Sequence, residues 1–128
     1  MREPLVTLLR RAALTAERLA AEDLLSLGIT PIQLLLLRAI RDNPMASQRG
    51  LVQCTGIDRS TMSKMIQKLL QQGLISRVDD PKDGRRWRVC LMASGDTIVR
   101  EAEKICAKTE KKIMAEIPVE QIRAWVGP

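Results

Sequence analysis

The chain has 128 residues, of which 45% are hydrophobic and 28% are charged, and its formal net charge is +6. This length and composition suit one folded domain rather than a disordered segment. There is no His, Phe or Tyr. Without His the chain lacks the commonest general base and the commonest transition-metal ligand, which disfavours an enzyme, a metal site and a bound cofactor.

The three cysteines, Cys54, Cys90 and Cys106, are an odd number and show no CxxC spacing. A disulfide framework is therefore not expected, and a reduced, cytoplasmic setting fits best. Their apolar sequence surroundings predict buried, inert thiols. No apolar run approaches the roughly 18 residues of a membrane span, and no secretory signal is recognisable, so we expect no membrane partner.

The first predicted helix follows Pro4, which suits an initial helical turn, and ends at Gly28. Apolar residues recur along it every three or four positions, as on one face of a helix. This stripe has to be covered, either by the rest of the same domain or by a second subunit. It consists of Leu5, Leu9, Ala12, Ala16, Leu19, Ala20, Leu24 and Leu27.

A Thr-Pro pair at residues 30–31 opens the second predicted helix, and an Asn-Pro pair at 43–44 ends it. The run Leu34–Leu37 is apolar nearly all round the helix, which predicts the buried centre of the domain. Ser47 caps a short third helix, which stops near Gly56.

Asp58 caps the fourth predicted helix, and Gly73 ends it. Its apolar positions are spaced as a core-facing stripe: Met62, Met65, Ile66, Leu69 and Leu70. The opposite face is polar and partly basic. It consists of Arg59, Ser60, Thr61, Ser63, Lys64, Gln67 and Lys68.

Residues 74–78 and 87–92 are strand-like, and the segment between them contains Pro and Gly typical of a tight turn. Together they predict a β-hairpin with a basic tip, or wing. Asp83 lies beside these basic residues and would be repelled by phosphate, so we expect it to hold a nearby arginine in place. The basic residues of the wing are Lys82, Arg85, Arg86 and Arg88.

A long helix is predicted from Ser94 until Pro118 breaks it, and residues 119–126 suit a short final helix. No internal repeat or low-complexity linker interrupts the chain. The pattern is mainly α-helical with one small hairpin, which is the outline of a winged helix-turn-helix.

The positive charge is concentrated in the middle of the chain. Residues 47–92 contain nine basic and four acidic side chains, whereas the other 82 residues contain twelve and eleven. A polyanion would therefore interact with the middle segment first. A solvated basic surface without a partner is the simpler interpretation of such a segment.

The arrangement of these basic residues favours double-stranded DNA as the partner. The N-terminal residues of a recognition helix reach base edges in the major groove, and Arg59, Ser60 and Thr61 occupy that position in the fourth helix. Arg85 follows a tight Asp-Gly turn, so it is placed to enter a narrow minor groove.

Three segments resemble the MarR family of bacterial transcriptional regulators. They are Gly73-Leu74-Ile75-Ser76-Arg77, then Asp79-Asp80-Pro81-Lys82-Asp83-Gly84-Arg85-Arg86, then Leu91-Met92-Ala93-Ser94-Gly95. The entry to the second helix and residues 60–63 also match, and the likeness covers roughly residues 28–115. Arg85 corresponds to the wing arginine of the family and Asp83 to the acid of the same motif. Met92 stands where the family usually has Thr, which weakens the expected cap of the next helix.

This resemblance implies a homodimeric winged-helix regulator, with a repressor as the expected form, that binds a pseudo-palindromic operator and is released by a small-molecule effector. Residues 29–92 would form the winged helix-turn-helix core of a single domain, with dimerisation helices at 1–28 and 93–128. The candidate dimerisation residues are Leu5, Leu9, Ala12, Ala16, Ile113, Ile117 and Ile122.

Two other functions compete with sequence-specific DNA binding. A winged-helix module for protein–protein contact, such as an accessory subunit, would expose an apolar face on the fourth helix, whereas this face is polar and basic. An enzyme lacks support, because the chain has no His, no Gly-rich phosphate loop and no paired-carboxylate motif.

Overall fold

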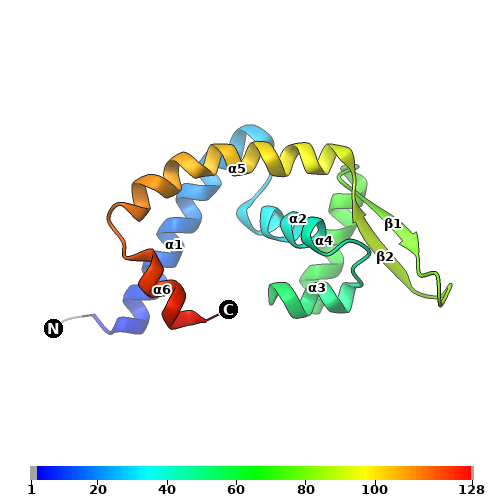
Figure 1. The fold of residues 1–128 in the computed structure, drawn as a ribbon, viewed down its shortest axis with the longest axis horizontal. Coiled ribbons are helices and arrows are strands. Elements are labelled where there is room, and N and C mark those ends of the chain that lie inside the picture. Colours follow the sequence, from blue (N-terminus) through cyan, green and yellow to red (C-terminus); the bar gives the residue numbers. More distant parts are fainter. Residues whose placement is uncertain (1–2, 128) are drawn as a thin grey trace.

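The computed structural model describes residues 3–127, in which helices and one hairpin form an arch (Figure 1). A helix-turn-helix body with its hairpin occupies one end of the arch, and α1 and α6 lie at the other end. The elements are α1 (Leu5–Leu24), the 3-10 turn η1 (Leu25–Leu27), α2 (Pro31–Asp42), α3 (Gln48–Thr55), α4 (Arg59–Gln71), β1 (Ile75–Asp79), β2 (Trp87–Leu91), α5 (Ala93–Met114) and α6 (Val119–Val126).

Local capping chemistry determines where the helices of the body begin. The Thr30 hydroxyl accepts a hydrogen bond from the Gln33 backbone, and the Gln33 side chain accepts one from the Thr30 backbone. Ser47 caps α3 through the Gly50 N–H, as expected from the sequence. Gly56, at a φ of 75°, ends α3 in the left-handed region that favours glycine.

The core of the body is aliphatic, because the chain has no Phe or Tyr to fill it. Leu36, Leu37, Leu51 and Met62 are completely buried. The expectation that Leu34–Leu37 are all buried is wrong at Leu35, which is 46% exposed. Leu35 lies on the side of α2 that faces away from this core, so a continuous apolar run does not imply burial all round the helix.

The hairpin is antiparallel, with Ile75 opposite Leu91 and Asp79 opposite Trp87. It joins the body through Val89, which is fully buried and whose N–H donates to the Ala46 carbonyl at 3.1 Å. The predicted strands are confirmed, with ends that differ by one residue.

The junction between β2 and α5 is tightly packed. Met92 is the N-cap of α5 and makes no side-chain capping bond, as expected from Met at this position. Its backbone N–H donates instead to the Leu74 carbonyl at 2.9 Å, and the Ser94 hydroxyl donates to the Gly73 carbonyl at 2.6 Å. Contacts with the Gly73–Leu74 backbone thus hold the start of α5 in place, although they supply no acceptor to the N–H groups of its first turn.

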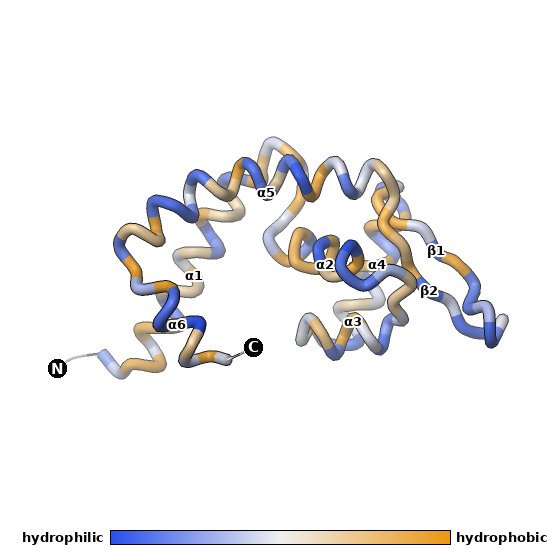
Figure 2. Tube along the Cα trace, viewed as in Figure 1, coloured by the Kyte–Doolittle hydropathy of each residue, from blue (hydrophilic) through white to orange (hydrophobic). Residues whose placement is uncertain are grey.

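The long helix α5 spans the arch and connects the body to the far end of the chain (Figure 1). It ends at Met114, before Pro118, so the prediction that it runs to Pro118 is wrong by one turn. Hydrophobic positions recur along α1 and α6 as far as their outer ends (Figure 2). Among residues 3–127 no single helix is long and apolar enough to cross a membrane, although α1–η1 and α2, bent by 76°, meet the length and composition test as a pair.

Candidate nucleic-acid interface

The start of α4 is held by Asp58. Its Oδ1 accepts a hydrogen bond from the Thr61 N–H at 2.8 Å, and its Oδ2 accepts one from the Thr61 hydroxyl at 2.7 Å. These two bonds lower the pKa of the Asp58 carboxyl. Because the Thr61 hydroxyl already donates to Asp58, it retains only acceptor capacity for a base or phosphate.

The polar face predicted for α4 is open to solvent. Ser63 on this face accepts a hydrogen bond from the Gln48 side chain at 2.7 Å, which links α3 to α4. Gln48 and Arg49 line a groove together with Arg59 and Ser63, and neither α3 residue was expected in the site from the sequence. The sequence feature that could have indicated Gln48 and Arg49 is their position at the start of α3, directly after the Ser47 cap. The exposed residues of α4 are Arg59, Ser60, Ser63, Lys64, Gln67 and Lys68, whereas Thr61 is half-buried.

The tip of the wing places two arginines in solvent. The side chain of Arg85 is 94% exposed and that of Arg86 is 76% exposed. Asp83 lies between them: its Oδ1 accepts from the Arg85 N–H at 3.1 Å and is 3.5 Å from Arg85 Nε, while its Oδ2 is 3.7 Å from Arg86 Nε. The carboxylate thus contacts both arginines of the tip.

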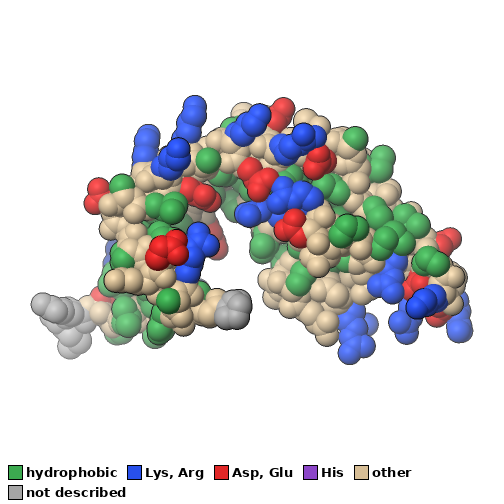
Figure 3. All heavy atoms as spheres, viewed as in Figure 1, with side chains coloured by type: hydrophobic (Ala, Val, Ile, Leu, Met, Phe, Trp, Pro, Cys, Tyr) green, Lys and Arg blue, Asp and Glu red, His purple; other side chains and the backbone are tan. Residues whose placement is uncertain are grey.

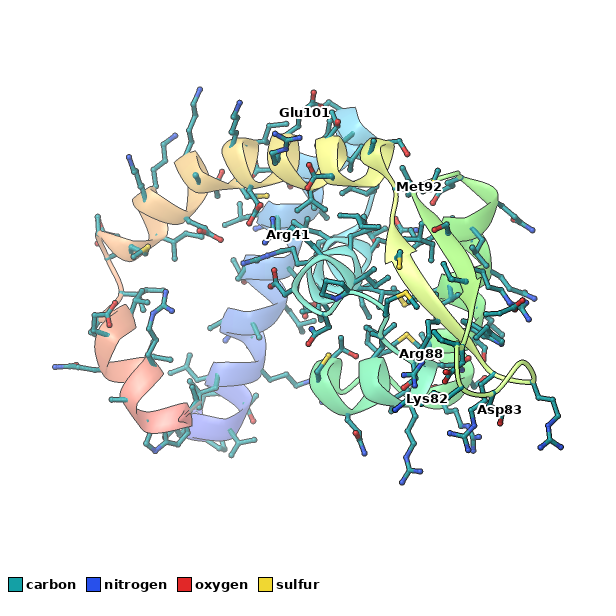
Figure 4. All side chains as sticks on the ribbon, turned by 45° about the vertical axis from the view of Figure 1, so that its right-hand side comes forward. Arg41, Lys82, Asp83, Arg88, Met92 and Glu101 are labelled. Carbon is teal, nitrogen blue, oxygen red and sulfur yellow. The ribbon has the colours of Figure 1, made fainter. Side chains whose placement is uncertain are left out.

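A second acid–arginine pair lies at the base of the wing tip and was not predicted. Asp80 is 9% exposed, and its Oδ2 accepts hydrogen bonds from Arg88 Nε at 3.2 Å and from an Arg88 terminal nitrogen at 3.0 Å. Its Oδ1 accepts from the Lys82 N–H at 2.8 Å. The Lys82 bond and the Arg88 guanidinium lower the pKa of the Asp80 carboxyl. Arg88, expected among the DNA-contacting residues, is therefore already bound within the wing (Figure 4).

Basic side chains gather around the hairpin tip and below it (Figure 3). Arg77 on β1 does not add to the tip, because its guanidinium stacks 4.7 Å from the centre of the Trp87 ring. A further row of basic side chains follows the outer face of α5, away from the body.

The thiols differ from the expectation of uniform burial. Cys106 is buried, Cys90 is half-buried and Cys54 is exposed, so the prediction is wrong for Cys54. Cys54 lies on the solvent side of α3, which the apolar neighbours in the sequence did not indicate. Within residues 3–127 no group of His, Cys, Asp or Glu side chains has the arrangement of a metal site.

The apolar stripe on α1 is covered by the rest of the described chain only near the body. Leu24 is completely buried, whereas Leu5 is 65% exposed and Leu9 is 44% exposed. On α6, Ile122 is 44% exposed, and Ile117 just before it is 39% exposed. Ala12 and Ala16 are also exposed, and Ile113 is half-buried.

A cavity of about 480 Å³ opens between α1, α2 and α5. It lies where the arm formed by α1 and the end of α5 meets the body. Arg38 and Glu103 on its wall are 3.5 Å apart, and Glu103 also binds Arg41 of α2 at 2.6 Å. This cluster connects α2 of the body to α5.

The fold is that of a winged helix-turn-helix protein. Helices α2, α3 and α4 form its three-helix body, α4 has the position of a recognition helix, and β1 and β2 form the basic wing. Comparisons with known proteins show which family the chain resembles. The profile described as "MarR family" matches residues 27–86. The transcriptional regulator HosA of Escherichia coli O111:H- is 29% identical over 93 residues, which cover 73% of this chain and 69% of HosA.

Two solved structures show the same fold. A mutant MarR from E. coli, complexed with operator DNA, is 23% identical, with a TM-score of 0.87 over 98% of this chain and 94% of that one. BpsR of Bordetella bronchiseptica, described in the context of regulation of its DNA binding by 6-hydroxynicotinic acid, is 26% identical. Its TM-score is 0.85 over 97% of this chain and 89% of BpsR. The chain is thus similar in sequence and fold to transcriptional regulators of the MarR family.

Proposed function

We propose that the protein is a homodimeric, sequence-specific repressor that binds double-stranded DNA in the cytoplasm and is released by a small ligand. The observation that carries this proposal is the surface formed by the exposed face of α4 and the wing tip, which we call the reading surface. It combines the exposed start of a helix with an arginine that is 94% exposed at the end of a ribbon.

Each part of the reading surface has a separate task in this proposal. Arg59 and Ser60 at the start of α4 contact base edges in the major groove, while Lys64, Gln67 and Lys68 contact bases or phosphates further along. Arg85 enters the adjacent minor groove, where the negative potential is enhanced. Short polar side chains at the start of α4 allow a close approach to the groove floor.

Two acids position the wing rather than contact DNA. Asp83 lies against Arg85 and Arg86 and limits the directions that these side chains take. Asp80 binds both Arg88 and the Lys82 N–H at the base of the loop. These bonds fix the direction in which the wing tip projects. We accordingly assign Arg88 to the support of the wing, and leave Lys82, Arg85 and Arg86 as its DNA contacts.

The exposed stripe of α1 and the exposed face of α6 form the dimer interface in this proposal. Large aliphatic side chains such as Leu5, Leu9 and Ile122 are unfavourable in water and are available to a second copy of the chain. A two-fold dimer presents two reading surfaces, which matches a pseudo-palindromic operator with half-sites about one helical turn apart.

Release by a ligand is proposed from the position of the cavity between arm and body. The arms set the separation of the two reading surfaces, so a molecule bound between α1, α2 and α5 changes that separation. A DNA complex of MarR and the named acid ligand of BpsR support DNA binding and ligand control as properties of similar proteins.

Selection from fragments of the source genome, including the region upstream of its own gene, tests the proposal. We expect a small set of enriched fragments, each with a footprint that contains two inverted half-sites. Arg59→Ala should relax the base preference at one position of each half-site, because it removes a base contact. If no fragment is enriched over random DNA at low salt, the proposed function is wrong.

A further inference from the structure

The outer face of α5 carries a row of lysines. Three of them recur every four positions, so their side chains lie on one face of the helix, and a fourth lies beside them. All four residues are exposed. They follow the side of α5 that faces away from the body (Figure 3). The members of this lysine row are Lys104, Lys108, Lys112 and Lys111.

The charge of the lysine row is not neutralised by nearby acids. Among residues 3–127 none of its members forms an ion pair with an acidic side chain. Glu103 is bound to an arginine of α2 at 2.6 Å, Asp96 is bound to Arg100 at 2.6 Å, and Glu110 lines the cavity. Glu101 lies on the outer face, three residues before the row begins (Figure 4). An uncompensated row of this kind attracts an anionic partner.

The chemistry of the row favours phosphate groups. Lysine is a compact point charge that binds phosphate without a fixed geometry, whereas paired recognition of carboxylates favours the planar fork of arginine. From its first to its last lysine the row is about 12 Å long, at 1.5 Å per residue. A DNA duplex carries one phosphate charge per about 1.7 Å of its axis, counted over both strands. Each lysine can therefore contact a different phosphate of one duplex.

A membrane or a single strand fits the row less well. Basic helices bind membranes stably when apolar side chains insert beside the charges. The exposed uncharged residue among the lysines is Ala107, and in the described part of α5 the large exposed apolar residue Met114 is the last of the helix. The helix also has no aromatic side chain on which the bases of a single strand could stack. The row thus offers charge alone, which suits the backbone of a duplex.

The lysine row and the reading surface lie on different sides of the molecule. In Figure 3 the row follows α5 along the top, whereas the arginines of the wing tip lie at the lower right. One straight duplex cannot contact both surfaces at the same time. Contact with both surfaces requires two duplexes, or two separate segments of one long DNA.

We propose that the lysine row binds the phosphate backbone of a second duplex, independently of its sequence, while the reading surface holds the operator. The protein then bridges two segments of DNA. This inference rests on the proposed binding of DNA at the reading surface. A protein that is already held at an operator meets neighbouring DNA at a high effective concentration, so a few phosphate contacts are sufficient.

Capture of a second duplex by an immobilised operator complex tests the proposal. An enriched operator is fixed to beads by one end, the full-length protein is added until both half-sites are occupied, and a fluorescent duplex of scrambled sequence follows. We expect the wild type to retain the scrambled duplex at low salt and to lose it as the salt concentration rises. Operator complexes that retain no scrambled duplex at low salt would overturn the proposal.

The double variant Lys104→Gln, Lys108→Gln tests the row, because Gln keeps the length and helix propensity of the side chain and removes its charge. We expect capture to fall at least about tenfold, with operator binding unchanged. Arg11→Gln, Arg18→Gln is the matched control, since it removes the same charge from α1. These two arginines share one face of α1, and Arg18 lines a groove with α2 to which α5 does not contribute. Equal capture by the wild type and the lysine variant would contradict the assignment.

Glu101→Gln tests the same surface in the opposite direction. It removes the acid that precedes the row on the outer face of α5, so capture of the scrambled duplex should rise roughly threefold. A structural role of these residues gives no reason for such a gain. Unchanged or weaker capture would show that the charge of this face does not hold the duplex.

The possible failures are distinguishable. Beads that retain no protein would refute the proposed operator binding and the bridging together, whereas retained protein without scrambled duplex would refute the bridging alone. Vesicles of phosphatidylserine and phosphatidylcholine test the membrane as the alternative partner. Sedimentation of the wild type with these vesicles, lost in the lysine variant and accompanied by no duplex capture, would assign the row to a membrane and overturn the proposal.

Discussion

The arginines of the wing have similar positions in the sequence and different environments in the structure. The side chain of Arg85 is 94% exposed, whereas that of Arg88 is 32% exposed and bound to Asp80. The exposed guanidinium of Arg85 is available to a phosphate or to a groove of DNA. The guanidinium of Arg88 already makes two hydrogen bonds to a carboxylate, so it contributes to the structure of the wing. The two residues should therefore respond differently to the same substitution.

Arg85→Ala is expected to weaken operator binding about tenfold and to reduce the salt dependence by about one counterion, because one cation leaves the interface. Its urea midpoint should equal that of the wild type. Arg88→Ala should instead lower the urea midpoint, since it leaves the Asp80 carboxylate without its cation. Fluorescence anisotropy with labelled operator and urea titration separate the two effects. Equal urea midpoints for both variants would contradict the supporting role of Arg88.

The Asp80 carboxyl has a pKa below its ordinary value, through the Lys82 N–H and Arg88. The ionised group therefore stabilises the fold at pH above its ordinary pKa of about 4, and this contribution disappears as the pH falls through the lowered pKa. Asp80→Asn should be less stable than the wild type at pH 7, and the difference should vanish in strong acid. Urea unfolding from pH 7 downward measures it. A difference that stays constant across this range would show that ionisation of Asp80 is not its cause.

Helix ends were the most predictable elements, because each depends on residues a few positions apart. The caps at Thr30, Ser47 and Asp58 and the left-handed glycines at Gly56 and Gly73 all lie where the sequence predicts them. Contacts between elements were not predictable in this way. The Gln48–Ser63 bond spans 15 residues and the Arg41–Glu103 pair spans 62, so both depend on how the helices pack.

In the candidate site, too, local features could be predicted from the sequence and contacts between elements could not. The basic excess and the polar face of α4 are properties of spacing and composition, and they could be identified from the sequence. The Asp80–Arg88 pair depends on hairpin register, which brings Arg88 opposite Val78 and two positions from Asp80. The exposure of Cys54 depends on which face of α3 meets α4. Neither follows from neighbours in the sequence.

Gly95 is required at the junction of β2 and α5 by lack of space. A Cβ at this position would collide with the Leu74 carbonyl oxygen and lie 2.8 Å from a methyl of Leu91. Gly95→Ala should therefore lower the free energy of unfolding by about 3 kcal/mol, because backbone atoms have to move. Gly84→Ala in the wing is the control, since nothing lies within 4 Å of the position that its Cβ would occupy. Thermal unfolding compares them, and equal stability of both variants would contradict the close packing.

At the scale of the whole molecule, the arch separates two surfaces with different chemistry. The body and wing carry the basic reading surface, and the far end carries exposed aliphatic side chains of α1 and α6 (Figures 2 and 3). One buried cluster nevertheless includes Leu24 of α1, Leu36 of the body and Val99 of α5. This shared cluster packs α1 and α5 against the body, and we propose on this basis that the chain is a single domain.

Leu9→Glu is expected to convert the proposed dimer into a monomer at micromolar concentration, because it places a charge in the proposed apolar interface. Light scattering should then give the subunit mass of 14.3 kDa instead of twice that value. Thr7→Glu, which adds the same charge on the other side of α1, should stay dimeric. A wild type that is monomeric at the same concentration would exclude the proposed interface.

Salt-dependent binding of an enriched operator tests the central claim most directly, with a scrambled duplex of equal length for comparison. If the reading surface binds DNA, the operator affinity falls steeply and linearly on a log–log plot against salt concentration, because several phosphate contacts release counterions. The operator should also remain bound at salt concentrations that release the scrambled duplex, because base contacts add to the phosphate contacts. Operator and scrambled duplex binding equally at every salt concentration would contradict sequence-specific recognition.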